Sequence, residues 1–513
     1  MDDNYRLKEW QERTEQALGM GGVEKIGRLH QNGRLTARER IHTLLDRDTF
    51  EEMGLLAHSD LPAAADKTPA DGKVTGFGLV NGRSIFVSAD DVTVMAGAGG
   101  RVGVGKQFQW ASYAAEKGYP CVHLGDAGGA RVPDIMGSAG MMSMVYPIQN
   151  PPRDRRVPLI TTIMGECYGG PSWTAAVSDI IIQVKGAIMA VGGPSILSVA
   201  TGEVAAPEEL GGWELHAHHT GQVDLFAENE EECLWLVRQV LGYLPENAQE
   251  PPPSVKAREA VKGDVLTAVP ADPKRAYDMH QLIHLIVDAD SLLELKPFFA
   301  PELITAFARL NGHVVGLVAN NPQHNAGAMG PGACDKASSF IVLCDSFHIP
   351  LLFWHDTPGF LIGKTAEHAS MPRKIMTWIE ALHQCTVPRV SLVVRKSYGM
   401  AHCNMSGGNM GSDALLAWPS ADVSFVAPEV AVSIVYGRKL AQLDDPQAAY
   451  EQYLDELNRA NAPWAAAGLN LIDRVIDPQQ TRQELINALH RARGPHGLGQ
   501  RSQRRLANWP RLL

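Results

Sequence analysis

The sequence predicts an α/β protein that contains the same domain twice. Two stretches match without a gap when one is moved 230 positions along the chain, as from Asp126 to Asp356 and from Tyr168-Gly169 to Tyr398-Gly399. In both stretches apolar strands alternate with helical segments, which is typical of parallel sheets built from crossover units. So long a period indicates two complete domains rather than a solenoid.

Length supports this division. The chain has 513 residues, which is more than a single hydrophobic core accommodates. Between the copies lies a Pro-rich stretch from Pro245 to Ser254, which is typical of a semi-rigid linker. We therefore expect one domain at residues 1–250 and a second at residues 251–513.

Composition narrows the classes of partner. The net charge of −11 argues against nucleic acid, which needs clustered Lys and Arg. No apolar run of about eighteen residues predicts a membrane span, and the polar start Met1-Asp2-Asp3 predicts no ordinary signal peptide. The seven cysteines form no C-x-x-C pair, so a reducing compartment is expected. We expect a cytoplasmic protein, with the mitochondrial matrix as an alternative although no transit peptide is seen.

The first elements can be predicted from local signals. Residues 1–50 are expected to be helical, and Thr36 and Glu39 form a capping box for a helix that runs to about Leu45. Apolar runs then flank Asn81-Gly82, the strongest short signal for a hairpin, and the repeat mate is Asn311-Gly312.

Each predicted hairpin leads into the same succession of segments. A glycine-rich stretch and a helix are followed by a strand that begins at Pro120 or Pro350 and ends at Asp126 or Asp356. Ligands bind at the carboxyl ends of such strands. The two aspartates lie at these ends, although capping a turn is their commoner use.

A second pair of glycine turns is the main candidate for chemistry. The segments Gly165–Gly170 and Lys396–Ala401 each follow an apolar strand and precede a helix. Glycine allows a ligand to approach the backbone, and the first helical N–H groups have no helical partner. Two such groups aimed at one point form an oxyanion hole. The alternative is a tight turn that binds nothing, but the repetition favours function.

Side-chain catalysis has no comparable signal. The run His216-Ala217-His218-His219 lacks a supporting carboxylate or Cys, and adjacent histidines would face apart on a strand, so no metal site is predicted. The chain has no G-x-S-x-G elbow, P-loop or G-x-G-x-x-G near the expected strands. We expect a reaction whose base arrives with the substrate or cofactor.

Several motifs resemble the carboxyltransferase (β) subunits of biotin-dependent acyl-CoA carboxylases. The segment Asp126–Arg131 resembles their D-S-G-G-A-R, and Asp356–Leu361 is similar to D-V-P-G-F-L. Further matches, in chain order, are Asn32–Ile41, Glu203–Gly212 and Ala417–Pro419. The resemblance covers the chain from about residue 20 to Asn487.

This resemblance implies two duplicated crotonase-like ββα-spiral domains in an α/β fold. It implies an acyl-CoA in the N-terminal domain and carboxybiotin in the C-terminal domain, with the active site between domains of two different subunits. A homo-oligomer, commonly a hexamer built as a trimer of dimers, is expected. The chain has no A-M-K-M biotinylation motif or ATP-grasp region, so biotin must arrive on a biotin carboxylase or biotin carboxyl carrier subunit.

The resemblance also implies roles for individual residues. The thioester oxygen of the acyl-CoA is expected at Gly169 and Gly170, and the ureido oxygen of biotin at Gly399, Met400 and Ala401. The CoA thioester is further expected to contact Gly99, Gly100, Gly128, Gly129 and Ala130, and biotin to contact Gly359, Phe360, Tyr398 and Cys403. Carboxybiotin is expected to release CO₂, and the biotinate that results is expected to take the α-proton, so that the enolate attacks CO₂.

Three departures from the family pattern stand out. The first turn usually reads A-G-G-A, but here Pro171 has no N–H to donate. The second reads Y-G-G-A in many members, and Met400 would be strained if it needed a positive φ. Cys403 stands where propionyl-CoA enzymes often carry Asp, so the acyl group is open. The alternatives are a decarboxylase of the same fold and a non-catalytic assembly partner.

Overall fold

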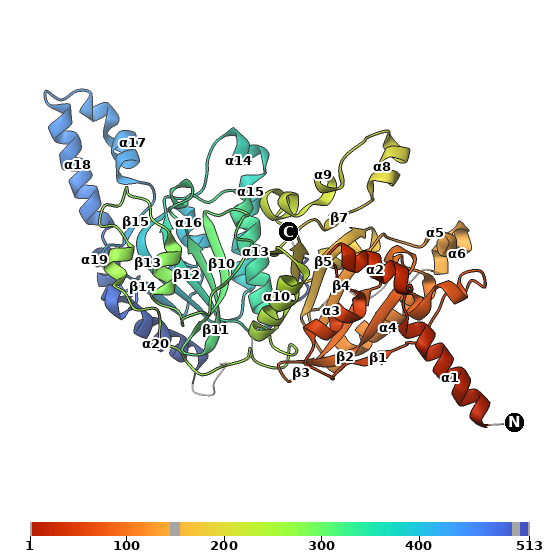
Figure 1. Ribbon diagram of the computed structural model, residues 1–513. Coiled ribbons are helices and arrows are strands. Elements are labelled where there is room, and N and C mark those ends of the chain that lie inside the picture. Colours follow the sequence, from red (N-terminus) through yellow and green to blue (C-terminus); the bar gives the residue numbers. More distant parts are fainter. Residues whose placement is uncertain (1–2, 144–153, 495–502, 511–513) are drawn as a thin grey trace. The chain divides into compact units, whose positions relative to one another are not determined.

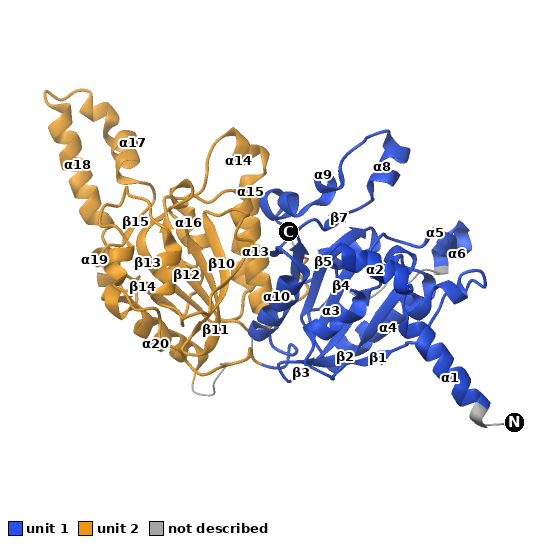
Figure 2. Ribbon diagram, in the orientation of Figure 1, with its two compact units in different colours: residues 1–250, 513 blue, residues 251–512 orange. Residues whose placement is uncertain are grey.

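The computed structural model describes residues 3–143, 154–494 and 503–510. Its elements are both helices and strands, and three helices, α1 to α3, precede the first strand (Figure 1). The chain divides into two compact units, residues 1–250 and 251–512 (Figure 2), and the division falls inside the Pro-rich stretch. We call residues 1–250 unit 1 and residues 251–512 unit 2. Across the parts of the chain described, none of the helices combines the length and the apolar run that a membrane crossing requires.

Unit 1 is built on one mixed sheet. The strand order is β1-β2-β3-β4-β5-β6-β8, and the short strand β7 also pairs with β5. The strands are β1 (Glu51–Met53), β2 (Lys73–Val80), β3 (Arg83–Asp90), β4 (Cys121–Ala127), β5 (Leu159–Tyr168), β6 (Ile180–Val184), β7 (Ile188–Ala190) and β8 (Leu225–Ala227). Strands β1 to β3 pair antiparallel, and pairing from β3 onward is parallel.

The helices of unit 1 follow the predicted crossover pattern. They are α1 (Asp3–Leu18), α2 (Val23–Gln31), α3 (Ala37–Leu44), α4 (Arg101–Lys117), α5 (Val132–Ile135), α6 (Gly137–Ser143), α7 (Gly170–Ala176), α8 (Pro194–Thr201), α9 (Pro207–Gly211) and α10 (Glu230–Tyr243). The predicted capping box at the start of α3 is confirmed, since the Glu39 N–H donates to Thr36 Oγ1 at 3.2 Å and the Thr36 N–H donates to Glu39 Oε2 at 2.8 Å.

Unit 2 repeats this topology. Its sheet has the order β9-β10-β11-β12-β13-β14-β16, and β15 pairs with β13 as β7 pairs with β5. The strands are β9 (Leu293–Leu295), β10 (Leu303–Leu310), β11 (His313–Asn320), β12 (Leu351–Thr357), β13 (Arg389–Tyr398), β14 (Ala414–Ala417), β15 (Asp422–Ser424) and β16 (Arg474–Val475). The helices are α11 (Val265–Ala268), α12 (Met279–His284), α13 (Pro331–Ser346), α14 (Lys364–His368), α15 (Met371–Gln384), α16 (Met400–Asn404), α17 (Pro428–Leu440), α18 (Pro446–Asn461), α19 (Pro463–Gly468) and α20 (Thr481–Arg493).

Polar contacts at the hairpins show that the units share one construction. The N–H groups of Asn81-Gly82 donate to the carboxylate of Asp46 at 3.1 and 2.8 Å. Those of Asn311-Gly312 donate to Asp288, both at 2.8 Å. Asp46 and Asp288 do not follow the 230-residue offset, because the second copy has a shorter separation between this aspartate and its hairpin. The duplication therefore extends beyond the matches visible in the sequence.

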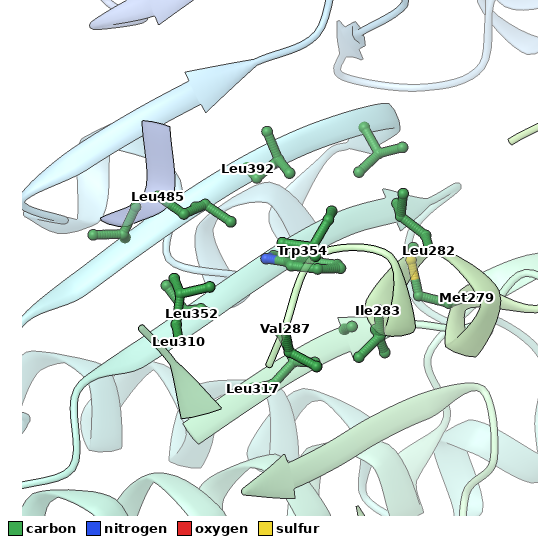
Figure 3. Packing of buried hydrophobic residues seen from close by; sticks show 14 of the residues in the cluster. Met279, Leu282, Ile283, Val287, Leu310, Leu317, Leu352, Trp354, Leu392 and Leu485 are labelled. Atoms are coloured by element: carbon green, nitrogen blue, oxygen red, sulfur yellow. The ribbon is translucent and has the colours of Figure 1, made fainter. Parts of the chain in front are cut away.

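A large hydrophobic cluster of unit 2 lies on one face of its sheet, beneath helices from both ends of that unit. Trp354 and Leu352 on β12 pack with Leu392 on β13, Ile283 on α12 and Leu485 on α20 (Figure 3), and each of these side chains is fully buried. Strand β12 is buried along its whole length, as expected for a parallel strand covered on both faces. This packing holds the carboxyl end of β12 in place, where the predicted site residues begin.

Candidate functional site

The two predicted oxyanion turns have the same backbone shape. Strand β5 ends at Tyr168 and strand β13 at Tyr398, and a glycine follows each. Gly169 has φ 64° and ψ −117°, and Gly399 has φ 58° and ψ −143°. Residues other than glycine are strained in this region. The turn therefore requires glycine at both positions.

In unit 1 the structure narrows the choice of backbone donor. The N–H of Gly169 donates to the carbonyl of Ala190 on β7 at 3.2 Å. This bond commits the N–H of Gly169 within the sheet, so of the two predicted residues, Gly169 and Gly170, only Gly170 keeps an N–H for a ligand oxygen. The next residue, Pro171, has no N–H. The N–H groups of the first turn of α7 are thus those of Gly170 and Ser172.

Unit 2 presents two consecutive donors. The N–H of Gly399 donates to the carbonyl of Ser424 on β15 at 2.9 Å, as its counterpart does in unit 1. Met400 and Ala401 then begin α16, and the first turn of a helix leaves its N–H groups without helical partners. Met400 is not among the residues with positive φ, because Gly399 takes that conformation. The expected strain at Met400 is absent, and its side chain is 43 % exposed.

The residues predicted to contact the CoA thioester come together in unit 1. Gly99 and Ala130 form a parallel bridge, in which the Gly99 N–H donates to the Gly129 carbonyl at 2.8 Å. A Cβ at Gly129 would lie 3.3 Å from the carbonyl oxygen of Tyr168. The glycine stretch, the turn after β4 and the turn after β5 therefore lie against one another.

Packing explains some of these glycines without a ligand. A Cβ at Gly100 would lie 1.8 Å from Nη2 of Arg131, so glycine is needed there to admit the guanidinium. Arg131 in turn forms buried ion pairs with Asp71 and Asp134, at 2.6 and 2.7 Å. By contrast, a Cβ at Gly128 would be 3.6 Å from the carbonyl oxygen of Ala96, an ordinary contact.

The counterpart turns of unit 2 contain the residues predicted to contact biotin. Met329 and Phe360 form the equivalent bridge, and the Met329 N–H donates to the Gly359 carbonyl at 3.0 Å. A Cβ at Gly359 would meet nothing within 4 Å, so the backbone is bare on that side. The ring of Phe360 packs edge-on against Trp378, with centroids 6.4 Å apart.

Asp126 and Asp356, which the 230-residue offset pairs, lie next to the ends of β4 and β12 and form ion pairs there. Asp126 accepts from Nη1 of Arg40 at 2.8 Å, and Asp356 accepts from Nε of Arg395 at 2.8 Å. Burial raises the pKa of Asp126, while the guanidinium groups of Arg40 and Arg34 act in the opposite direction. Both carboxylates are buried, so they hold structure and are not presented to a substrate.

Tyr398 and Cys403 have polar neighbours in unit 2. The Tyr398 hydroxyl donates to the carboxylate of Asp422 on β15, and burial together with this bond raises the Tyr398 pKa. The phenol therefore stays protonated at neutral pH. Cys403 is partly exposed, and Nδ2 of Asn409 lies 3.2 Å from its sulfur.

The sequence did not reveal a histidine network beside the unit 2 turn. Ser397 Oγ lies 2.8 Å from Nδ1 of His355 and 2.9 Å from Nδ1 of His402. Burial lowers the pKa of both imidazoles, which are therefore neutral. The two histidines are far apart in the chain and occur in no known spacing, so only the fold could bring them together.

The histidine run in unit 1 belongs to a different element from the one predicted. Residues 215–220 form a π-helical turn rather than a strand. The buried ring of His216 contacts the Met189 carbonyl through Nε2 at 2.7 Å. Within the described ranges, no group of three His, Cys, Asp or Glu side chains could hold a metal ion.

Known proteins share both sequence and fold with this chain. The carboxyl transferase domain family matches residues 28–501. The carboxyltransferase subunit of propionyl-CoA carboxylase from Haloferax mediterranei is 36 % identical over 489 residues, covering 94 % of this chain and 95 % of that protein. The α subunit of methylmalonyl-CoA decarboxylase from Propionigenium modestum is 34 % identical over 498 residues, covering 95 % and 96 %.

A solved structure extends the likeness to three dimensions. The crystal structure of transcarboxylase 12S, a hexamer assembly with methylmalonyl-coenzyme A and methylmalonic acid bound, superposes with a TM-score of 0.87 at 34 % identity and covers 95 % of each chain. This confirms the predicted crotonase-like α/β fold in two copies. Because the matches span almost the whole chain, the protein belongs to the carboxyl transferase domain family and is a carboxyltransferase of the biotin-dependent acyl-CoA carboxylase type.

Proposed function

We propose that unit 1 binds an acyl-CoA and unit 2 binds biotin carried by a partner chain, and that the protein moves a carboxyl group between them. The observation that supports this most directly is the repeated glycine turn. At each turn the glycine N–H is committed within the sheet, and the following helix begins with N–H groups for a ligand oxygen.

The backbone supplies the catalytic contacts. In unit 1 the Gly170 N–H donates to the thioester oxygen as negative charge develops on it, which is the usual work of an oxyanion hole. Pro171 contributes nothing, so the Ser172 N–H is the second candidate. In unit 2 the N–H groups of Met400 and Ala401 donate to the ureido oxygen of biotin.

Biotin fits the unit 2 residues. The backbone is bare at Gly359, where a side chain would meet nothing within 4 Å, and Met400 and Cys403 are partly exposed beside the turn. Carboxylated biotin, when bound, supplies the carboxyl group and the base for the α-proton. This explains why the buried Asp126 and Asp356 need not act as bases.

We further propose that the working form is a homo-oligomer, a hexamer arranged as a trimer of dimers, in which unit 1 of one protomer faces unit 2 of another. The hexamer of the transcarboxylase 12S structure supports an oligomer. Biotin is then delivered by a biotin carboxylase or biotin carboxyl carrier subunit.

A decarboxylase is the second candidate. Identity of 34 % to a methylmalonyl-CoA decarboxylase subunit favours it, because both reactions use the same half-sites. A third possibility, a non-catalytic assembly partner, is suggested by the absence of a donor at Pro171.

The deciding experiment screens acyl-CoAs for biotin-dependent carboxylation with a biotin carboxylase and carrier supplied. Incorporation of labelled bicarbonate into one acyl-CoA supports the proposed function. Release of CO₂ from malonyl- or methylmalonyl-CoA without any forward carboxylation favours the decarboxylase. Binding of CoA thioesters without exchange of label in either direction would identify the non-catalytic partner and refute the proposal.

A further inference from the structure

A buried ion pair lies under the glycine stretch of unit 1. Lys73 on β2 and Asp90 on β3 are cross-strand partners, and they are 2 % and 1 % exposed. Nζ of Lys73 lies 2.6 Å from Oδ1 of Asp90 and donates at 2.8 Å to the carbonyl of Gly97. The ammonium group therefore holds the backbone where the glycine stretch begins.

The same pair reaches the turn after β4. The second carboxylate oxygen of Asp90 accepts from the N–H of Asp126 at 3.1 Å. The two turns are already in close contact, since a Cβ at Gly97 would lie 2.4 Å from the carbonyl oxygen of Asp126. One ion pair thus joins the segment that contains Gly99 and Gly100 to the segment that contains Gly128–Ala130.

Further polar side chains surround the pair. Nε2 of His123 lies 3.5 Å from Oδ2 of Asp90. Nδ1 of His123 is 3.0 Å from Ser88 Oγ and 3.0 Å from Nε2 of Gln107. We name these five residues, Lys73, Ser88, Asp90, Gln107 and His123, the Lys73 cluster.

Unit 2 builds the same turns without charge. Leu303 and Asn320 occupy the equivalent cross-strand positions, and Oδ1 of Asn320 accepts from the Asp356 N–H at 3.1 Å. The close approach is also retained, with 2.3 Å between a Cβ at Gly327 and the Asp356 carbonyl oxygen. The rest of the cluster is replaced by the apolar residues Val318, Ala337 and Phe353 at the same offset.

The two units show that the turns can form without the charged pair. Removing two charges from water is costly, and a neutral pair of similar size is often as stable or more so. Unit 2 shows that a leucine and an asparagine suffice for the turn geometry. The charged pair therefore serves something that unit 1 does and unit 2 does not.

We propose that Lys73 and Asp90 are positioning residues of the acyl-CoA half-site, which lock the Gly97–Gly100 and Asp126–Ala130 turns together against movement when the thioester binds. This inference rests on the proposed function of unit 1. A leucine at position 73 cannot donate to the Gly97 carbonyl, so the turn would keep its shape but lose its restraint.

The test replaces Lys73 and Asp90 by the residue types that unit 2 has at the equivalent positions, leucine and asparagine. The double variant Lys73→Leu/Asp90→Asn avoids the unpaired buried charge that Lys73→Leu alone would leave. Transfer of the carboxyl group from methylmalonyl-CoA or malonyl-CoA to free biotin is measured, together with the equilibrium Kd of each CoA thioester. We expect KM and Kd for the CoA thioester to rise by about 10-fold, which is less than the roughly 10²-fold that a misplacement of about 1 Å can cost, because the turns keep their shape. KM for biotin should stay unchanged.

A matched variant controls for stability. Lys336→Met in unit 2 removes a buried lysine that donates to the carbonyls of Lys296 and Phe299 at 2.8 and 2.9 Å, so it should lower Tm without changing the Kd for CoA thioesters. A double variant with wild-type KM and Kd for CoA thioesters would overturn the positioning role. Wild-type protein that binds no CoA thioester would instead overturn the proposed function of unit 1, so the two failures are distinct.

Discussion

Replacing the turn glycines by alanine tests the backbone mechanism most directly. Gly399→Ala adds one methyl group to a residue with φ 58° and ψ −143°. Gly169→Ala makes the equivalent change at φ 64° and ψ −117°. Neither variant removes a polar group, so any loss of turnover must come from the altered shape of the turn.

The structure predicts unequal costs for the two changes. Both carry the strain of an unfavourable backbone region, about 1–3 kcal/mol. At Gly399 the new Cβ would also lie 2.9 Å from the carbonyl oxygen of Phe425, so that backbone must shift. At Gly169 the nearest atom is the Val191 carbonyl oxygen at 3.8 Å, an ordinary contact. Gly399→Ala should therefore destabilise the protein more than Gly169→Ala.

The strain is relieved by rotating the turn, which turns the next N–H away from its ligand. Loss of one oxyanion donor lowers kcat by about 10²–10³, and we expect this loss in both variants. Carboxyl transfer from a CoA thioester to free biotin is the assay. Gly399→Ala should leave the Kd for the CoA thioester unchanged, because the change lies in unit 2.

Gly437→Ala is the matched control. This glycine lies within α17, where an added Cβ meets nothing within 4 Å, so stability should rise slightly and turnover should not change. Suppose that Gly399→Ala and Gly169→Ala both keep kcat within about twofold of the wild type. The decrease in kcat that normally follows removal of an oxyanion donor would then be missing. These turns would then be purely structural.

Three further outcomes are expected. Met400→Gly should keep turnover within about threefold, since the site needs only an N–H and Met adapts to irregular gaps; inactive wild type with an active Met400→Gly would indicate a non-catalytic partner. Hydrogen bonds to Glu294 and Asp278 raise the His280 pKa from 6.5 to about 9, so this contribution to the free energy of unfolding should be complete below pH 6.5 and lost as pH rises through 9. His280→Gln should remove that part of the pH dependence in chemical denaturation, and an unchanged slope would contradict it. Trp354→Ala should lower the free energy of unfolding by about 3–5 kcal/mol, whereas a loss below about 1 kcal/mol would mean that this core collapses around the cavity.

Local signals in the sequence predicted much of the fold. The hairpin at Asn81-Gly82 is confirmed between β2 and β3, and Asn311-Gly312 joins β10 to β11 in the same way. Strand β4 contains Asp126 and β12 contains Asp356 next to their last residues, as the repeat predicted. These features depend on residues close together in the chain, where turn chemistry and alternation act directly.

The donor at each glycine turn could not be predicted in this way. Strand β7 has three residues, and nothing in Ile188–Ala190 indicates that its last carbonyl accepts from Gly169. The same holds for β15 and Gly399. A contact between segments some twenty residues apart depends on the completed sheet, so sequence patterns identified the turn but not which N–H it leaves for a ligand.

Arg238 on α10 allows unit 1 to complete its fold during synthesis of the chain. Its guanidinium donates to the Leu44 carbonyl at 2.6 Å and to Asp46 at 2.9 Å, so a late helix holds an early segment of the same unit. Arg482 makes the equivalent bonds to the Ile286 carbonyl and Asp288 in unit 2. Domains generally fold as units during synthesis, the N-terminal one first. Once α10 has left the ribosome, unit 1 can complete its structure before the first strand of its sister copy emerges, which limits mispairing between two sheets of the same topology.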